Sequence, residues 1–243
     1  MDWHTRYVQQ ARWTEQLRSY LFGKVGIPAG GRVLEPGCGT GALLCEFPPL
    51  TTLHGLDVNY AVLDKAGQHA PGAVLACGDV ASLPYADGVF DLAYCHFLLL
   101  WLPDPLGALK EMRRVTRSGG VVLALAEPDY GGRIDYPEPL SQVGRWQADS
   151  LRKQGADPVM GRKLAGLFVR AGFRGVESGI LGGEWREGGS PVEDEQEWNV
   201  LAHDTEGAVS REELLRLKIL DQAARANGER VLFVPTFFAW GRV

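Results

Sequence analysis

Short apolar runs alternate with amphipathic or turn-like segments over the first half of the chain. Five of these runs have the length and apolar content of buried strands. They are Val33–Leu34, Thr52–Leu56, Ala73–Ala76, Phe90–Tyr94 and Val121–Ala126. Because strands and helices alternate in this way, the pattern predicts a parallel sheet that is covered by helices on both faces.

Helices are predicted where apolar residues recur three or four positions apart. This spacing between Trp3 and Leu21 indicates one amphipathic N-terminal helix. Another helix is expected to begin at Asp104–Pro105, where an N-cap residue precedes a proline at the first helical position. Gly119–Gly120 is expected to end that helix, since glycine is common just after a helix C-terminus.

The regular alternation stops after Glu127. Residues 127–158 are rich in proline, glycine and aromatic residues. A later polar, acidic segment contains Ser210 and Glu213 at the spacing of a capping box, which predicts a helix there. The other predicted elements are helices at Pro139–Gln154 and Met160–Arg170 and strands near Val176–Trp185 and Arg230–Trp240.

Composition excludes several classes of protein. The chain has 243 residues, 45% hydrophobic and 23% charged, with a net charge of −5 and no long basic run, which argues against a nucleic-acid partner. The strongly apolar stretch between Asp91 and Asp104 is too short to cross a bilayer, so no membrane partner is expected. Met1–Tyr20 is polar and amphipathic, unlike a signal peptide, which predicts a cytoplasmic protein.

The cysteines and histidines do not form a metal-binding pattern. None of the four cysteines has a partner at CxxC spacing, and the five histidines are scattered. We therefore expect no metal site, and unpaired, buried thiols that suit a reducing compartment. The cysteines are Cys38, Cys45, Cys77 and Cys95.

The strongest chemical signal is a glycine-rich turn, Glu35-Pro36-Gly37-Cys38-Gly39-Thr40-Gly41, between the first strand and a predicted helix. Glycines at alternate positions let the backbone turn sharply and let a ligand approach the main chain. The turn lies at the carboxyl end of a parallel strand, where open α/β sheets bind ligands. By itself this motif is also compatible with a tight turn that binds nothing.

Polar residues follow the next strands at the same predicted edge. Asp57 ends the second strand, where a carboxylate can accept hydrogen bonds from ribose hydroxyls. Asp79 follows the third strand, and Cys95 and His96 end the fourth. Taken singly, Asp57 and Asp79 could be helix N-caps and His96 a core residue. Their order along consecutive strands is what favours a nucleotide site.

These segments resemble the successive motifs of the class I S-adenosylmethionine-dependent methyltransferases, and most closely the group of ubiquinone and menaquinone C-methyltransferases and related small-molecule enzymes. The matching segments are VLEPGCGTGALL, GLDVN, GDVASLPYADGVFDLAYCHFLLLWLPDP and LKEMRRVTRSGGVVLALAEPD. The resemblance covers residues 32–128. The usual Lys-Pro-Gly-Gly of the family is Arg117-Ser118-Gly119-Gly120 in this chain.

The resemblance implies an α/β, Rossmann-like open sheet of seven strands, mostly parallel, with an antiparallel last strand, helices on both faces and helical lid insertions. We expect a single domain over residues 1–243. Its predicted parts are an N-terminal lid helix in 1–28, a cofactor-binding core in 32–126, and substrate-side insertions in 127–158 and 182–229. The N-terminal helix and the two insertions match no general motif of the family, so substrate selection is expected in these three segments.

The resemblance also implies S-adenosyl-L-methionine as cofactor, with no metal, and a small-molecule methyl acceptor as partner. The turn would surround the methionine end of the cofactor. Asp57 would hold the ribose, and the adenine would lie beside Val58, Asp79 and Val80. Cys95 or His96 would close over the sulfonium. The turn residues implied to contact the cofactor are Glu35, Gly37, Cys38, Gly39 and Gly41.

Methyl transfer mainly requires alignment of the nucleophile with the methyl group and exclusion of water. Where the nucleophile is a hydroxyl or an acidic carbon, a general base helps, and the candidates are His96, Glu127 and Asp129. Core packing for His96, and turn chemistry for Glu127 and Asp129, are the structural alternatives. Aromatic residues that could line a lid or an apolar substrate cavity are Tyr7, Trp13, Trp101, Tyr130 and Trp146.

Two other functions fit part of the pattern. A nicotinamide-dependent oxidoreductase would carry G-x-G-x-x-G, whereas this turn is G-x-G-x-G preceded by Glu35. A catalytically inert protein that binds S-adenosylmethionine as a sensor or scaffold would keep Asp57, Asp79 and the glycines. Intact binding residues do not distinguish that case from an enzyme.

Overall fold

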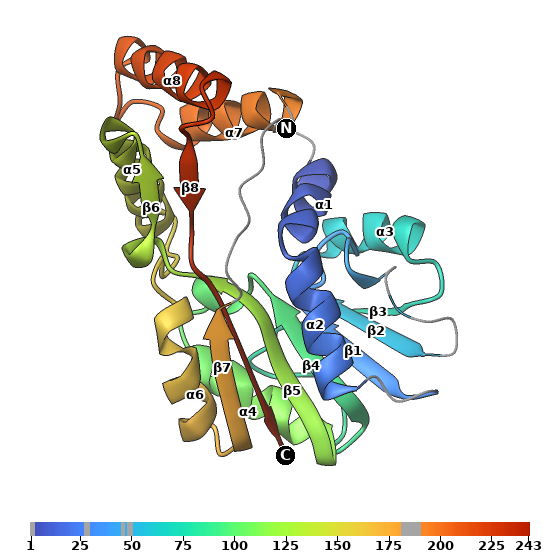
Figure 1. The fold of residues 1–243 in the computed structure, drawn as a ribbon. Coiled ribbons are helices and arrows are strands. Elements are labelled where there is room, and N and C mark those ends of the chain that lie inside the picture. The colour runs from blue at the N-terminus through green and yellow to red at the C-terminus, as the bar shows by residue number, and fades with distance from the viewer. Residues whose placement is uncertain (1–2, 27–29, 45–46, 48–50, 181–190) are drawn as a thin grey trace. The chain divides into compact units, whose positions relative to one another are not determined.

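The computed structural model describes residues 3–26, 30–44, 47, 51–180 and 191–243, apart from the side chains of residues 3 and 191–193. The chain divides into two compact units, each drawn as a ribbon in Figure 1. The first unit contains residues 1–127, 160–181 and 236–243, and the second contains residues 128–159 and 182–235.

The first unit is built on a seven-stranded sheet with strand order β3-β2-β1-β4-β5-β9-β7. Strands β1 to β5 pair in parallel, and β7 pairs with β9 in the antiparallel direction. The predicted Rossmann-like sheet with an antiparallel last strand is therefore confirmed. The strands are β1 (Arg32–Pro36), β2 (Thr52–Asp57), β3 (Val74–Cys77), β4 (Phe90–His96), β5 (Thr116–Pro128), β7 (Arg174–Ile180) and β9 (Thr236–Arg242).

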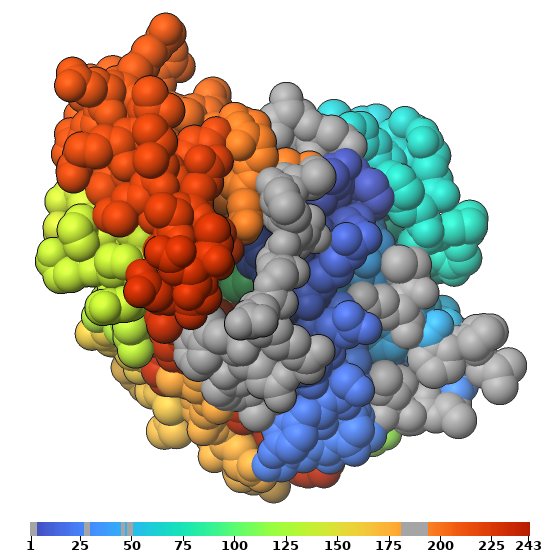
Figure 2. Space-filling model, turned by 45° about the horizontal axis from the view of Figure 1, so that its top comes forward, coloured from blue at the N-terminus to red at the C-terminus, as the bar shows by residue number. Residues whose placement is uncertain are grey.

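The helices of the first unit enclose this sheet. α1 and α2 form the blue part of the surface in Figure 2, and α4 lies behind the sheet in Figure 1. The helices are α1 (Trp3–Trp13), α2 (Glu15–Val25), α3 (Tyr60–His69), α4 (Pro105–Val115) and α6 (Leu164–Arg170), with short 3-10 turns η2 (Leu99–Trp101) and η5 (Gly161–Lys163).

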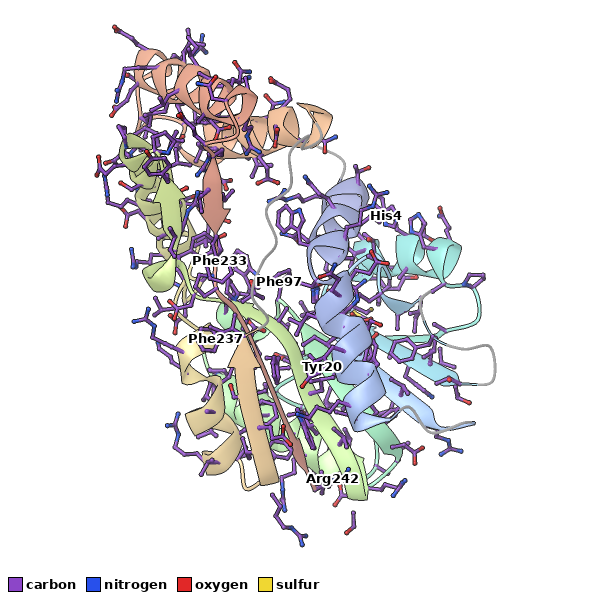
Figure 3. All side chains as sticks on the ribbon, viewed as in Figure 1. His4, Tyr20, Phe97, Phe233, Phe237 and Arg242 are labelled. Atoms are coloured by element: carbon purple, nitrogen blue, oxygen red, sulfur yellow. The ribbon has the colours of Figure 1, made fainter. Side chains whose placement is uncertain are left out.

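The central strands are buried on both faces, as the continuous apolar runs predict. Leu92 and Tyr94 of β4 belong to a core cluster with Leu21 of α2. Ala93 and Cys95 alternate with them and are also fully buried. Tyr20 of α2, labelled in Figure 3, presents its ring edge-on to Phe238 of β9, with ring centroids 6.4 Å apart. Burial on both faces holds the strand ends in a rigid frame.

The structure corrects two predicted boundaries. The single N-terminal helix is interrupted at Thr14, whose φ of −109° and ψ of 9° are not helical. α4 ends at Thr116, whose hydroxyl donates to the Met112 carbonyl oxygen at 2.7 Å. Gly119–Gly120 therefore does not cap α4 but lies inside β5, where the register with β4 shifts. The cause in each case is a side-chain contact that periodicity does not reveal.

Three further predictions differ from the structure, and two lie wholly or partly outside the described residues. The predicted strand Arg230–Trp240 is two strands, β8 (Val231–Phe233) and β9, that belong to different sheets on either side of Pro235. Cys77 is exposed, whereas Cys38 and Cys95 are buried as predicted. Residues 42–44, after the glycine turn, form turns where a helix was expected. Cys45 and the end of the predicted strand Val176–Trp185 lie outside the described residues.

The second unit packs three helices and a two-stranded sheet around its own core. The core residues are Leu140, Val143, Trp198, Leu201 and Leu217. Ser210 caps α8 by accepting a hydrogen bond from the Glu213 N–H at 3.2 Å, as the capping-box spacing predicts. The elements are η3 (Tyr130–Gly132), β6 (Ile134–Tyr136), η4 (Glu138–Leu140), α5 (Ser141–Lys153), α7 (Pro191–Asp204), α8 (Arg211–Ala226) and β8, which pairs with β6.

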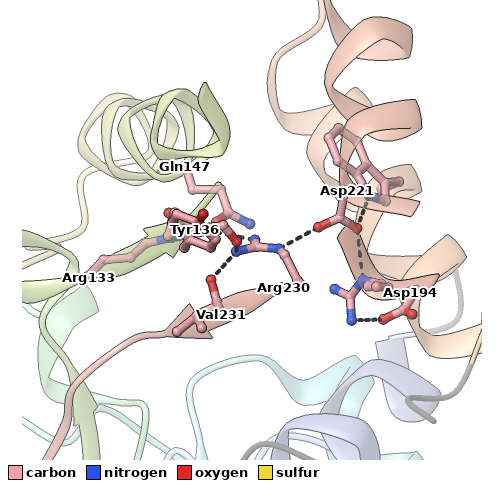
Figure 4. Close-up of polar contacts among 10 residues, drawn as sticks. Arg133, Tyr136, Gln147, Asp194, Asp221, Arg230 and Val231 are labelled. Carbon is pink, nitrogen blue, oxygen red and sulfur yellow. Dashed lines mark hydrogen bonds and ion pairs between the residues drawn. The ribbon is translucent and has the colours of Figure 1, made fainter. Parts of the chain in front are cut away.

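A chain of buried ion pairs joins the elements of the second unit (Figure 4). Asp135 on β6 accepts from Arg133 at 2.6 Å and from Arg230 at 2.8 Å. Arg230 also donates to Asp221 on α8 at 2.6 Å, and Asp221 accepts from Arg225 at 2.9 Å. The side chains of Arg133, Asp135, Arg230 and Asp221 are only 2–6% exposed. We call these residues, with Arg225, the second-unit ion network.

Candidate functional site

The glycine turn that follows β1 has a backbone that only glycine adopts without strain. Gly37, Gly39 and Gly41 have φ values of +71°, +52° and +77°. A Cβ at Gly37 would lie 2.7 Å from a methyl carbon of Leu98, and one at Gly41 would lie 3.2 Å from the Ala66 backbone. The alternate glycines are therefore required both by conformation and by space.

Hydrogen bonds fix the turn to the end of β2. The N–H groups of Gly37 and Cys38 donate to the Leu56 carbonyl oxygen at 2.7 and 3.1 Å. The Gly39 N–H donates to one oxygen of Asp57 and the Asn59 N–H to the other, both at 2.9 Å. A carboxylate offers about four acceptor positions, so Asp57 retains capacity for further donors. The turn and Asp57 thus form one connected unit.

The carboxyl ends of neighbouring strands bring the other predicted polar residues to the same edge of the sheet. Asp57 ends β2, His96 ends β4 and Asp79 follows β3 by two residues. Asp79 is exposed, and one of its oxygens accepts the Ala81 N–H at 2.9 Å. Val58 is 74% exposed, whereas Val80 is buried. Asn59, rather than Asp57, is the N-cap of α3.

α1 lies against the glycine turn through polar and aromatic contacts. His4, labelled in Figure 3, has its Nδ1 2.8 Å from the Thr40 hydroxyl and stacks on His69 of α3 with ring centroids 3.5 Å apart. Nδ1 of His69 lies 3.2 Å from the Thr40 carbonyl oxygen. The Tyr7 ring lies 3.3 Å from the place that a Cβ of Gly39 would take. Burial, followed by the Asp57 charge, raises the pKa of Tyr7.

His96 is held by the break between α1 and α2. Its Nε2 lies 2.9 Å from the Thr14 hydroxyl, which accepts a hydrogen bond from Arg18 at 2.7 Å. Arg18 also donates to the Ala11 carbonyl oxygen. Burial, and then the positive charge of Arg18, lower the pKa of His96 to about 3. The imidazole is therefore neutral at neutral pH and is a weak base.

Glu127 is fully buried near the end of β5, where its carboxylate accepts three backbone N–H groups. The N–H groups of Leu98 and Leu99 donate to one oxygen at 3.0 and 2.8 Å, and that of Leu100 donates to the other at 3.1 Å. Burial raises the pKa of Glu127 to about 8, although the three donors act in the opposite direction. These contacts make Glu127 the anchor of η2, whose N-cap residue Leu98 packs against Gly37.

The remaining charged and nucleophilic groups of the turn point into the interior. Glu35 is buried and accepts a hydrogen bond from the Tyr94 hydroxyl at 2.8 Å. Burial, with the nearby charges of Glu35 and Asp57, raises the pKa of the Cys38 thiol. Burial likewise raises the pKa of Cys95 well above its usual value, with the charges of Glu127 and Glu35 adding to the effect. Both thiols are thus un-ionised and unreactive near neutral pH.

Comparison with known proteins agrees with this geometry. The model of a methyltransferase-domain family matches residues 34–124, from β1 through β5. The chain is 28% identical to the demethylmenaquinone methyltransferase of Bacillus licheniformis, over 70% of this chain and 81% of that protein. It is 33% identical to an uncharacterized 37.1 kDa protein in transposon TN4556 of Streptomyces fradiae, over 69% of this chain and 51% of that protein.

A solved structure has the same fold. Phosphoethanolamine N-methyltransferase 2 of Haemonchus contortus, in complex with phosphomonomethylethanolamine and S-adenosylhomocysteine, superposes with a TM-score of 0.60. The two are 16% identical, with 97% of this chain and 56% of that chain covered. The chain thus carries a methyltransferase domain over residues 34–124. It spans about half the length of several curated relatives, with 51%, 56% and 49% covered for three of them.

The first unit carries the residues predicted to bind cofactor, and the aromatic candidates are distributed over both units. Tyr7 lies at the turn, while Trp13 is exposed with the Arg6 guanidinium 4.8 Å from its ring centre. Trp101, in η2, is partly exposed. In the second unit, Trp146 packs against the core cluster of that unit. Tyr130 begins η3.

Asp129 also belongs to the second unit. It is buried, and its carboxylate accepts the Gly131 N–H at 2.9 Å as the N-cap of η3. Asp129 thus has the structural role in a turn that the sequence indicated as the alternative to a general base. Its contacts therefore explain its presence in the sequence without a catalytic function.

Five residues that contact the candidate site were not identified as candidates from the sequence. They are His4, Thr14, Arg18, Thr40 and His69. Only Thr40 lies inside a recognised motif, and the others are scattered along helices. The contact between Thr14 and His96 spans 82 positions, and that between His4 and Thr40 spans 36. Such pairs depend on tertiary packing and have no local pattern.

Two absences hold for the described part of the chain. Within residues 3–26, 30–44, 47, 51–180 and 191–243, no group of three His, Cys, Asp or Glu side chains is placed to hold a metal ion. Among the described helices, none combines the length and the apolar character that crossing a bilayer requires.

The stability of the protein is expected to decrease as pH rises, because of Glu127. Its pKa is about 8 in the folded chain against an ordinary value of 4.5, so the folded state keeps a proton that the unfolded state has released. Since the folded state binds more protons over this interval, the free energy of unfolding falls as pH rises from about 4.5 to 8. Urea unfolding at several pH values measures the slope. In Glu127→Gln this contribution should vanish, and identical slopes in the two proteins would contradict the assignment.

Proposed function

We propose that the chain transfers a methyl group from S-adenosylmethionine to a small-molecule acceptor. The observation that carries the proposal is the connected arrangement of the glycine turn and Asp57 at the carboxyl edge of the sheet. The Gly39 N–H donates to Asp57, and three glycines of the turn adopt left-handed backbone conformations. This arrangement combines close access to the main chain with a carboxylate that has spare acceptor capacity.

The residues present fit S-adenosylmethionine. Gly37, Gly39 and Gly41 keep the main chain free of side-chain atoms where the methionine portion would lie. Asp57 would accept the ribose hydroxyls, and the exposed Val58 side chain would contact the adenine. Asp79 uses one oxygen to accept the Ala81 N–H, and its other oxygen would accept the adenine amino group.

The proposed mechanism rests on alignment and exclusion of water. When bound, S-adenosylmethionine supplies a methyl group on a positively charged sulfur, which the acceptor takes by in-line displacement. The chain itself contributes binding, orientation and a dry environment. His96, neutral and hydrogen-bonded to Thr14, would orient groups at the end of β4. Its low pKa makes it a poor general base, so an acceptor with a readily available electron pair suits this site best.

A small-molecule acceptor is favoured over a macromolecule by the charge of the chain and by its relatives. The net charge is −5, and long basic runs are absent from the sequence. The match with one relative covers 81% of that relative's length. This relative is a demethylmenaquinone methyltransferase, whose name refers to a quinone. We infer that the second unit, which the family motif does not cover, selects the acceptor.

Calorimetry with S-adenosylmethionine, S-adenosylhomocysteine and NADPH tests the cofactor. We expect both adenosyl compounds to bind one site per chain and NADPH to give no saturable heat. Because the turn lacks the dinucleotide spacing, binding of NADPH alone would overturn the proposal and favour an oxidoreductase.

An inert sensor or scaffold is distinguished by turnover. Incubation with S-adenosylmethionine that carries a labelled methyl group, together with a small-molecule extract, should move label into a product of low molecular mass. If both adenosyl compounds bind and no extract accepts label, the chain is a binding protein and the catalytic part of the proposal fails.

A further inference from the structure

The second unit contains a groove that the methyltransferase motifs do not account for. It lies between α5 and the segment 130–135, with a cavity volume of about 420 Å³. This volume falls within the range of about 300–1,000 Å³ that is typical of small-molecule sites. All of its lining residues belong to the second unit, so its shape follows from that unit alone.

One wall of the groove is a face of α5. Arg145, Asp149 and Arg152 line it at spacings of four and three residues, which place them on the same side of a helix. The other wall comes from Tyr130 and Arg133. At Gly144 of α5 a Cβ would lie 2.7 Å from the Arg133 Cδ. The absence of a side chain there lets Arg133 lie directly against the helix.

The arginine charges on the two walls of the groove are neutralised to different extents by carboxylates. Arg133 is neutralised by Asp135, which accepts from its Nε at 2.6 Å and from a terminal nitrogen at 3.1 Å. Asp135 is also shared with Arg230 at 2.8 Å. Because one carboxylate serves two guanidinium groups, this wall holds no spare negative charge.

Arg145 makes its hydrogen bonds to neutral oxygens. It donates to Gln142 Oε1 at 3.1 and 2.7 Å and to the Ser141 hydroxyl at 3.0 Å. Among the residues that the structure describes, no carboxylate forms an ion pair with its guanidinium. Arg145 thus brings to the groove a positive charge that these residues leave uncompensated.

Arg152 is available to a ligand for a different reason. It pairs with Asp149 at 2.8 Å, but the two side chains are 56% and 64% exposed. Exposed ion pairs of this kind contribute little to stability. An anion in the groove can therefore replace Asp149 as the partner of Arg152 at small cost, and two guanidinium groups on one helix face then meet one ligand.

We propose that this groove binds the oxyanion group of a small organic acid, a carboxylate or a phosphate monoester, through Arg145 and Arg152. Guanidinium groups form charge-assisted, often bidentate, hydrogen bonds with both oxyanions. The Tyr130 side chain supplies an aromatic wall for the organic part of the ligand. The proposal does not rest on the proposed methyl transfer, because every residue it uses lies outside the glycine turn and the strand ends that are predicted to bind the cofactor.

Titration with phenyl phosphate and with benzoate, each at constant ionic strength in sodium chloride, tests the proposal on the whole chain. We expect saturable binding of one or both probes, and the stronger of the two identifies the oxyanion. Arg145→Gln should weaken binding by about tenfold or more, since a charge-assisted hydrogen bond is lost. Arg216→Gln, which removes an exposed arginine of α8 outside the groove, should leave the affinity unchanged.

Asp149→Asn is expected to change the affinity for the probes in the opposite direction. Removal of its charge frees Arg152, so the probes should bind several-fold more tightly, an effect that a merely structural role of Asp149 would not produce. All three positions are exposed, and a thermal melt checks that each variant folds. The proposal is overturned if neither probe saturates, or if Arg145→Gln and Arg216→Gln bind equally well.

Discussion

Replacement of Arg230 by Met is expected to lower the free energy of unfolding by about 3–5 kcal/mol, because it removes the central cation of the second-unit ion network. Arg230 bridges Asp135 of β6 and Asp221 of α8, at 2.8 and 2.6 Å (Figure 4). It also donates to the Val231 carbonyl oxygen. Both carboxylates are nearly inaccessible to water, so each would lose a charged partner that solvent cannot replace.

The matched control is Arg152→Met, which removes the same side chain from an exposed pair with Asp149. That change should cost no more than about 1 kcal/mol. Urea unfolding gives the two free energies, and hydrogen exchange of the 211–226 peptide shows whether α8 loses protection. Equal decreases in the free energy of unfolding for the two variants would mean that the network stabilises the fold no more than a surface ion pair does.

Removal of the Asp57 carboxylate should have the largest effect on the proposed cofactor site. In Asp57→Ala we expect S-adenosylhomocysteine to bind about 10- to 100-fold more weakly, or roughly 1–3 kcal/mol, because charge-assisted hydrogen bonds to the ribose are lost. The Gly39 and Asn59 N–H groups also lose their acceptors, which loosens the turn. Calorimetry with the purified variant measures the change.

Two companion variants separate ligand contact from loop order. Asp57→Asn keeps one acceptor oxygen and should recover part of the affinity. Asp64→Ala removes an exposed carboxylate from the neighbouring helix α3 and should bind S-adenosylhomocysteine normally. An unchanged affinity in Asp57→Ala would refute the ribose role, whatever the state of the turn.

The sheet of the first unit follows closely from periodicity, and the exceptions have physical causes. Apolar runs identify β1 to β5 because both faces of a central parallel strand are buried. The interruption at Thr14 is absent from the pattern because it is stabilised by His96 and Arg18 rather than by local sequence. Pro235, inside the run predicted as one strand, was the available signal for the division into β8 and β9, since proline lacks the N–H that a ladder needs.

The candidate site was predictable where it depends on strand ends and not where it depends on side-chain pairing. Asp57 and Asp79 lie at the predicted edge because the carboxyl ends of parallel strands share one side of the sheet. The stacked His4 and His69 pair around Thr40 joins three segments far apart in sequence. The burial of Glu127 could not be predicted from the sequence either, because its turn-like context does not show that three N–H groups converge on its carboxylate.

The order of the strands has a consequence for synthesis of the chain on the ribosome. β7 pairs within the sheet only with β9, and β9 also lies beside β5. Residues 236–242 of β9 are made after every residue of the second unit. Until they emerge, β7 and the outer edge of β5 have no partner, and unpaired strand edges promote aggregation. The sheet is therefore completed late, and truncations before residue 236 should collect in the insoluble fraction.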